Sequence, residues 1–180
     1  MSNSIYNISA HTSSASQKYA LNDIVKNGDY HYYCIQAHDN ASGAQTPSTT
    51  STYWNGTTNF GSDGVLPYFF WRPAYNYTVK WEPRNRVIAF GDGYEQRAPD
   101  GIQNNLMTLD LTFDVRGEDE ATAILHFLHT RNGAEAFVFY PPKPYNVSKK
   151  FRAPNWDMSA SFQGNFSIRT TFLETSMENE

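Results

Sequence analysis

Residues 106–131 constrain the fold of this chain more than any other stretch. Residues 106–115 alternate between apolar and polar side chains, which is typical of a strand with one buried side. The apolar members are Leu109, Leu111, Phe113 and Val115, and the polar members are Thr108, Asp110, Thr112 and Asp114. A strand of this kind must bury its apolar side against a second layer, so we expect another element to cover it.

A helix that can serve as this cover is predicted directly downstream, at residues 118–131. Its apolar side chains recur at i, i+3, i+4 and i+7, which places them on one face. They are Ala121, Ile124, Leu125 and Leu128. Acidic residues crowd its start and Arg131 lies in its last turn, as the helix dipole favours, and Gly133 provides a stop.

The rest of the chain has the pattern of short strands separated by turns. Strands are expected at residues 20–25, 31–37, 52–54, 68–71, 75–81, 87–90, 136–140 and 161–173. Residues 1–17 are polar and predict a tail, and residues 55–64 are rich in Asn, Gly and Thr and predict a linker. Many strands around one helix predict antiparallel sheet with a packed helix, not a βαβ repeat.

Composition excludes several classes of protein. The 180 residues are enough for one domain, or for one domain with a small module. A net charge of −4 argues against sequence-specific nucleic-acid binding, which needs a basic face. No apolar run approaches the roughly 20 residues that cross a bilayer, and residues 1–16 do not resemble a secretory signal. We therefore expect synthesis in a cytoplasm and no membrane segment.

No group of residues predicts catalysis, a metal or a cofactor. His126 and His129 have a spacing that can hold a metal, but without a third His or a Cys nearby they are expected at surface and flank positions. Asp92, Glu95 and Asp100 lack the spacing of a calcium loop. The single cysteine, Cys34, lies within an expected strand and predicts a buried, inert thiol.

A distinctive sequence run occupies residues 90–102. It reads Phe90-Gly91-Asp92-Gly93-Tyr94-Glu95-Gln96-Arg97, then Pro99-Asp100-Gly101-Ile102 after one intervening residue. Together with Phe70-Trp71-Arg72-Pro73 upstream and Phe127-Leu128 and Pro141-Pro142 downstream, this run resembles the minor tail proteins of lambda-like long-tailed bacteriophages. The resemblance covers about residues 66–180.

The resemblance implies both a fold and a function. The implied fold is mainly β: an antiparallel β-barrel or sandwich of the tail-tube type with one flanking α-helix. The implied function is that of a non-enzymatic structural subunit of the virion, located at the phage tail tip. Six copies would form a ring between the tail tube protein and the host-recognition tip, in contact with other tail-tip proteins.

The same run has physical features suited to an interface between subunits. Glycines allow backbone angles that side chains forbid, an aspartate can bond the backbone of its own turn, and arginines can fork to carboxylates or carbonyls. A ring also needs two different, complementary faces on each subunit. The candidate interface residues are Arg84, Gly91, Asp92, Gly93, Tyr94, Glu95 and Arg97.

A second resemblance lies upstream, at residues 18–60. Tyr19-Ala20-Leu21-Asn22-Asp23-Ile24-Val25 and the aromatic residues that follow it are similar to a small chitin-binding-type carbohydrate-binding module. The implied sugar-stacking residues are Tyr30, Tyr32, Tyr53 and Trp54. The alternative function is thus an adhesin module that contacts a host-surface glycan. The same rings can equally form a small core of their own, within a module that projects outward.

Overall fold

In the computed structural model, the described residues are 6, 8–14, 16–28, 30–39, 46–48, 51–56, 67–90, 93–102 and 104–175. The linker expected at 55–64 therefore lies mostly outside them. The described elements are one helix and fourteen strands. These are β1 (Ser9–Ala10), β2 (Lys18–Tyr19), β3 (Ile24–Asn27), β4 (Tyr30–Cys34), β5 (His38–Asp39), β6 (Trp54–Gly56), β7 (Tyr68–Phe69), β8 (Thr78–Trp81), β9 (Asn85–Ala89), β10 (Glu95–Pro99), β11 (Met107–Arg116), α1 (Glu118–Arg131), β12 (Phe137–Phe139), β13 (Lys149–Phe162) and β14 (Asn165–Glu174).

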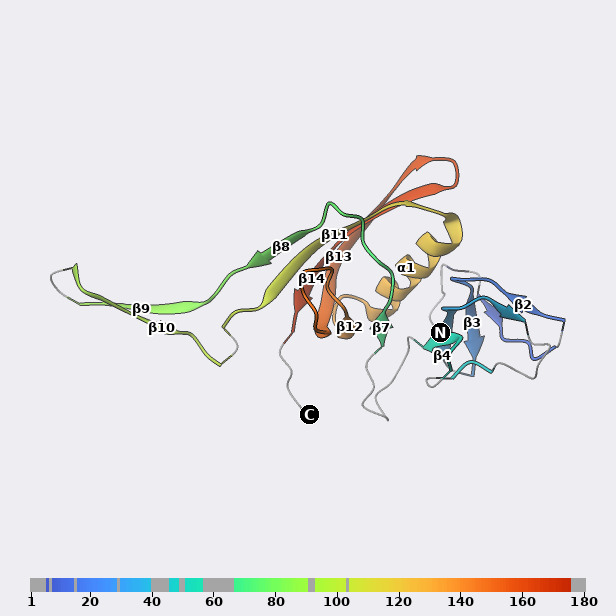
Figure 1. Cartoon of the computed structure of the whole chain (residues 1–180), viewed down its shortest axis with the longest axis horizontal. Coiled ribbons are helices and arrows are strands. Elements are labelled where there is room, and N and C mark those ends of the chain that lie inside the picture. Colours follow the sequence, from blue (N-terminus) through green and yellow to red (C-terminus); the bar gives the residue numbers. More distant parts are fainter. Residues whose placement is uncertain are drawn as a thin grey trace.

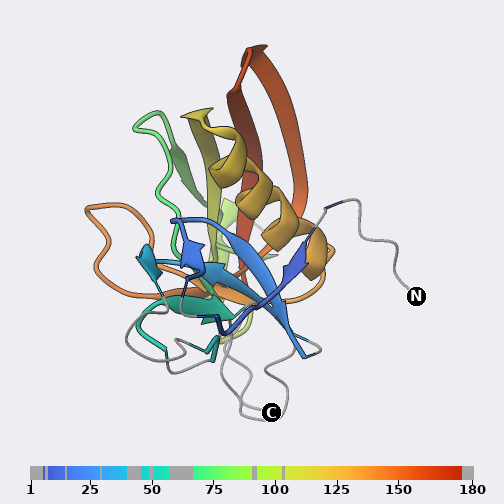
Figure 2. The same ribbon diagram turned by 90° about the vertical axis from the view of Figure 1, so that its right-hand side faces the viewer.

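The main body is a six-stranded sheet with α1 packed against it (Figures 1 and 2). The strand order is β7-β12-β13-β14-β11-β8, and every pair is antiparallel except β12 with β7. The sheet curls, because side chains at the edge strand β8 bond to the loop that follows β12, next to the opposite edge: Tyr77 donates to the Lys143 carbonyl at 2.7 Å, and Trp81 donates to the Tyr145 hydroxyl at 3.1 Å. The mainly β fold with one flanking helix is confirmed.

The predicted alternation of β11 is confirmed along most of its length. Leu109, Leu111 and Phe113 are buried in the main core, whereas the side chains between them are partly exposed. Val115 departs from the prediction and is exposed. The pairing with β14 shifts register between Phe113 and Arg116, and Val115 has a φ of 54°, so this β-bulge turns its side chain away from the core.

The helix has the predicted bounds, and its apolar face is buried less evenly than predicted. Ile124 and Leu128 are fully buried, whereas Leu125 is only partly buried at the edge of the core. At its C-terminus Asn132 takes a left-handed cap position with a φ of 48°, and the predicted stop, Gly133, follows it with a φ of 72°. No helix in the described part of the chain has the length and apolar character needed to span a membrane.

The long strand β13 was not expected from the sequence. Pro154 lies within it, and its apolar residues do not alternate regularly. The structure accommodates the proline at an irregularity in the pairing with β14, between Arg152 and Asn155. Proline lacks a backbone donor, so a bulge is one of the few places where a sheet tolerates it.

The N-terminal residues form a second, smaller β part next to the helix (Figure 1). One sheet has the order β1-β3-β4-β6, and β2 pairs with β5. A small core lies within this part and consists of Tyr19, Val25, Tyr32, Cys34 and Trp54. Burial raises the pKa of the Cys34 thiol to about 11, as expected for an inert cysteine. Strand β1 pairs in parallel with β3, so part of the expected tail belongs to this sheet.

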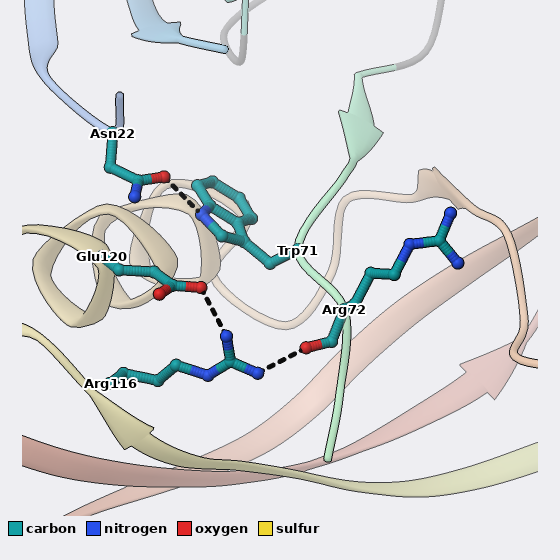
Figure 3. A network of polar contacts seen from close by, with 5 residues as sticks. All are labelled: Asn22, Trp71, Arg72, Arg116 and Glu120. Carbon is teal, nitrogen blue, oxygen red and sulfur yellow. Dashed lines mark hydrogen bonds and ion pairs between the residues drawn. The ribbon is translucent and has the colours of Figure 1, made fainter. Parts of the chain in front are cut away.

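Strand β4 joins the small β part to the main body, because both of its faces are covered. Tyr32 faces the small core, while Tyr33 is buried in the main core, 5.3 Å from Trp71 between ring centroids. Figure 3 shows the neighbouring polar contacts: Trp71 Nε1 donates to Asn22 Oδ1 at 3.0 Å. The small part therefore leans on the main body, and its projection outward from a ring stays a prediction.

An arginine connects α1 to the start of the segment that leads into β8. Arg116 donates to the Glu120 carboxylate at 2.8 Å and to the Arg72 carbonyl at 2.6 Å (Figure 3). Arg72 directly follows Trp71 in the upstream run Phe70-Trp71-Arg72-Pro73. This run therefore holds the entry to β8 against both the helix and the N-terminal part.

His126 lies at this joint and is buried, which corrects its expected surface position. Its Nδ1 shares a hydrogen bond of 2.5 Å with the Tyr33 hydroxyl, and its ring lies 4.9 Å from that of His31. His129, three residues along, shares a 2.6 Å hydrogen bond with the Tyr6 hydroxyl. Burial, together with the charges of His31, His129 and Arg131, lowers the pKa of His126 to about 4.

Removing a buried apolar side chain from α1 should cost more than removing its partly exposed neighbour. Leu128→Ala should lower the free energy of unfolding by about 2–5 kcal/mol, since it leaves a cavity in the core. Leu125→Ala is the matched control and should cost about 1 kcal/mol, typical of a less buried site. Urea unfolding of both variants measures the difference, and equal losses below about 0.5 kcal/mol would mean that this face is not packed on the sheet.

Acidification should weaken the joint between the two β parts through His126. The folded pKa of about 4 lies below the ordinary 6.5, so the stability from neutral His126 is complete above pH 6.5 and is lost as pH falls toward 4. The loss should reach about 3 kcal/mol, at 1.36 kcal/mol per pKa unit. His126→Gln removes this titration. Unfolding free energies measured from pH 7 to 4 should fall less steeply in the variant, and parallel curves would contradict the assignment.

Candidate subunit interface

Strands β9 and β10 form a two-stranded arm that extends away from the main body (Figure 1). They pair with each other in antiparallel register, from Glu95 opposite Ala89 to Pro99 opposite Asn85. Neither strand pairs with any other strand in the described residues. Every residue of the two strands is exposed except Ala98, which is partly buried.

The two faces of the arm differ in character. Residues opposite each other in the register share a face, so Ile88 lies beside Gln96, and the next pair toward the tip is Phe90 with Tyr94. Phe90 is 51% exposed and Tyr94 is 78% exposed. The other face pairs Val87 with Arg97 and Ala89 with Glu95. One face of the arm tip is thus aromatic, and the other carries an ion pair.

The structure brings the described candidate interface residues together on this arm. Arg84 lies at its base, where its backbone N–H donates to the Asn104 carbonyl at 2.8 Å and its carbonyl accepts from Asp100 at 3.0 Å. Gly93 has a φ of 78°, which favours glycine, and precedes Tyr94 at the tip. Arg97 donates to Glu95 at 3.1 Å. Gly91 and Asp92 lie outside the described residues.

Sequence reasoning missed the apolar residues of the arm. It selected the glycines and charges of the turn and assigned residues 87–90 to an ordinary strand. A signal for the arm is present in the sequence: the short segments 85–89 and 95–99 flank the Gly91-Asp92-Gly93 run, which is typical of a hairpin. Val87, Ile88 and Phe90 are exposed and therefore available for contacts outside the chain.

An isolated two-stranded hairpin is at best marginally stable in water. Among the residues that the structure describes, this arm packs on no core, and it exposes aliphatic and aromatic side chains next to one another. Contiguous exposed apolar side chains of this kind mark sites of protein contact. The geometry therefore fits a contact element that is completed by another molecule.

The candidate sugar-stacking residues occupy a different kind of position. Tyr32 is 7% exposed and Trp54 is 2% exposed, and both belong to the small core. Their rings therefore offer no flat surface on which a sugar could stack. Tyr30 is 38% exposed, and Tyr53 is partly buried against the small core. The four residues do not form a shared exposed platform, because Tyr32 and Trp54 are buried in the small core.

The described residues also offer little for chemistry at a metal. Within them, no group of three or more His, Cys, Asp or Glu side chains is arranged to hold a metal ion. His126 and His129, the pair with suitable spacing, bond instead to Tyr33 and Tyr6. Both hydrogen bonds connect α1 to residues of the N-terminal part.

Comparison with known proteins relates the main body to phage tails. Residues 67–176 match the model of a family described as phage minor tail protein. Tail tip protein M of Escherichia phage lambda is 40% identical over 81 residues, which cover 45% of this chain and 73% of that protein.

A solved structure of the tail of an empty GTA particle with C6 symmetry contains a chain with 12% identity and a TM-score of 0.39, over 56% of this chain and 75% of that chain. This likeness is too weak to support an argument. The family match spans the main body and the arm together, and it confirms the resemblance carried by residues 90–102. The chain therefore belongs to the phage minor tail protein family, and its place is in the tail of a phage particle.

Proposed function

We propose that this protein is a non-enzymatic, ring-forming structural subunit of the phage tail tip. Six copies, the number that the family resemblance implies, form the ring. The tail tube protein and other tail-tip proteins are its neighbours on either side. The observation that supports this proposal most is the exposed β9–β10 arm, which has no packing partner among the described residues of its own chain.

The tail-tip location rests on the relative in phage lambda, which is a tail tip protein. That relative and this chain share 40% identity over 81 residues, well above what fold similarity alone requires. The ring rests on the form of the subunit. An arm that contacts a different surface of the next subunit makes a head-to-tail contact, and such contacts generate rings when the rotation closes.

The energetics of the arm favour assembly. Burying a Phe or Ile side chain completely stabilises a complex by about 1.5–3 kcal/mol relative to exposure. Ile88, Phe90 and Tyr94 together could therefore supply several kcal/mol at each interface, by the same estimate. Aromatic anchors of this kind commonly dominate interface energetics.

The test of the ring is the mass of the assembled protein and its dependence on the arm tip. Native mass spectrometry should find six copies, and Tyr94→Ser should raise the dissociation constant of each interface at least about tenfold, equivalent to 1.4 kcal/mol. Phe162→Ser is the matched control, since Phe162 is equally exposed at the tip of the β13–β14 hairpin. A monomeric wild-type protein, or equal weakening by both variants, would contradict the proposal.

Arg97 should matter for assembly and not for folding. Its guanidinium bonds only to exposed Glu95 in the described residues, so Arg97→Ala should change the free energy of unfolding by no more than about 0.5 kcal/mol. The same variant should block tail assembly in a complementation assay, because the arm loses a charged contact. Normal tails, counted by electron microscopy, would show that Arg97 has no role in the interface.

A further inference from the structure

The five histidines of the chain all lie in the small β part or on the helix that it contacts. His11, His31 and His38 belong to the small part, and His126 and His129 belong to α1. None lies in a strand of the six-stranded sheet. Histidine is the side chain whose ordinary pKa lies closest to neutral pH, so this distribution concentrates proton uptake on one side of the molecule.

His126 lies at the centre of the joint between the small β part and α1, and it is 4% exposed. Its Nδ1 shares the 2.5 Å hydrogen bond with the Tyr33 hydroxyl. Its ring lies edge-on to those of His31 and Tyr6, at 4.9 and 5.3 Å between centroids. All three contacts cross from the N-terminal residues to the helix. A proton on this ring would place a charge out of reach of water, which is costly unless a partner group offsets it.

The groups that face His126 do not offset such a charge. They are Tyr33 and His31 on β4, Tyr6 before β1, and His129 and Arg131 on α1 itself. None of these five is a carboxylate. Arg131 already carries a positive charge and pairs with Glu135 at 2.7 Å, and Lys26 adds positive charge near His31. A protonated His126 would therefore meet repulsion as well as burial.

The pKa values of the two histidines that meet across the joint follow from this environment. Burial, with the charges of His31, His129 and Arg131, lowers the pKa of His126 to about 4. Burial and the charge of Lys26 also lower the pKa of His31. When the small part separates and water reaches both rings, their pKa values return toward the ordinary 6.5. Proton uptake therefore favours the separated state, and the docked state is fully stabilised only above about pH 6.5.

Separation at the joint would leave most of each core in place. The small core of Tyr19, Val25, Tyr32, Cys34 and Trp54 lies within the small part. Among the described residues, Tyr33 is the one buried member of the main core that the small part supplies, and partly buried Ile24 pairs with it. The joint can thus open as a local event with both sheets intact, as contiguous parts of a protein commonly do.

We propose that this joint is a pH-dependent switch: proton uptake by His126, together with His31, separates the small β part from α1, while the six-stranded sheet and the small core stay folded. The separation develops as the pH falls from about 6.5 toward 4. The separated part stays connected to the body through the chain that follows β6. The switch does not depend on ring formation, because every residue that it uses lies in one copy.

Hydroxyl-radical footprinting of the full-length protein tests this switch, because it measures the exposure of individual side chains. Tyr33 and Trp71 are buried at the joint and detect separation, whereas Phe113 in the main core and Trp54 in the small core detect unfolding. Between pH 7 and 4, oxidation of Tyr33 and Trp71 should rise at least about tenfold, the factor that one pKa unit contributes to the equilibrium. Phe113 and Trp54 should stay protected. No rise at the joint down to pH 4, or an equal rise at all four residues, would overturn the proposal.

A pair of matched variants assigns the separation to His126. His126→Gln provides an amide that can bond to the Tyr33 hydroxyl and cannot take up a proton, so Tyr33 should stay protected down to pH 4. The control is His38→Gln, which removes a histidine that packs on Tyr19 and Trp54 inside the small part. The control should separate over the same pH range as the wild type.

A third variant decides the assignment if His126→Gln is already separated at pH 7. His31→Gln removes the imidazole that faces His126 from β4, so less repulsion opposes a proton on His126 and the small part should separate at a lower pH than in the wild type. Separation at the wild-type pH in His31→Gln, or in a docked His126→Gln variant, would overturn the switch.

Discussion

The packing of helix α1 is the interaction on which the rest of the structure depends. Its apolar side chains, with Ile124 and Leu128 fully buried, cover the apolar side of the curled sheet. Its other buried positions meet the N-terminal part, since His126 bonds to Tyr33 across the joint. One helix therefore supports two β parts, and neither part is covered in this way by any other described element. A loss of packing on α1 would expose both cores at once.

This central packing has a consequence for the arm. The main core fixes β8 and β11, and the Arg116 contact with the Arg72 carbonyl fixes the chain segment that leads into β8. Residues 82–84 and 100–106 connect these two strands to the arm. The arm is therefore attached at both ends to a packed body, while its own side chains remain exposed in the described residues. A rigid base with an unsatisfied tip lowers the entropy lost on association, which favours a specific contact over a loose one.

The sequence predicted the parts of the fold that local periodicity encodes. The bounds of α1 and the alternation of Leu109, Leu111 and Phe113 were correct, because each element shows its own period over ten or more residues. Strand β13 was missed because Pro154 and an uneven pattern disguise it. The exposure of Val115 depends on a register shift between two strands, which no local pattern contains.

For the candidate sites too, the sequence predicted local features and missed those that depend on tertiary packing. The sequence located the candidate interface turn but not the aromatic face of the arm. The exposure of the arm's side chains depends on whether another element covers its strands, which local sequence does not show. Alternation placed Tyr30 and Tyr32 on one face of β4, but it could not show that tertiary packing covers both faces of that strand. Tyr32 and Trp54 are therefore core residues, although their sequence pattern resembles that of a sugar-binding surface.

The arm as an assembly interface is the central claim, and hydrogen–deuterium exchange tests it most directly. Amides of β9 and β10 bond only within a two-stranded ribbon, so they should exchange rapidly in the free subunit. In assembled tails the same amides should exchange at least about tenfold more slowly, since each 1.4 kcal/mol of added stability corresponds to that factor. Amides of β11, paired on both sides, provide the internal reference. Equally rapid exchange of residues 85–99 in free subunits and in tails would contradict the account.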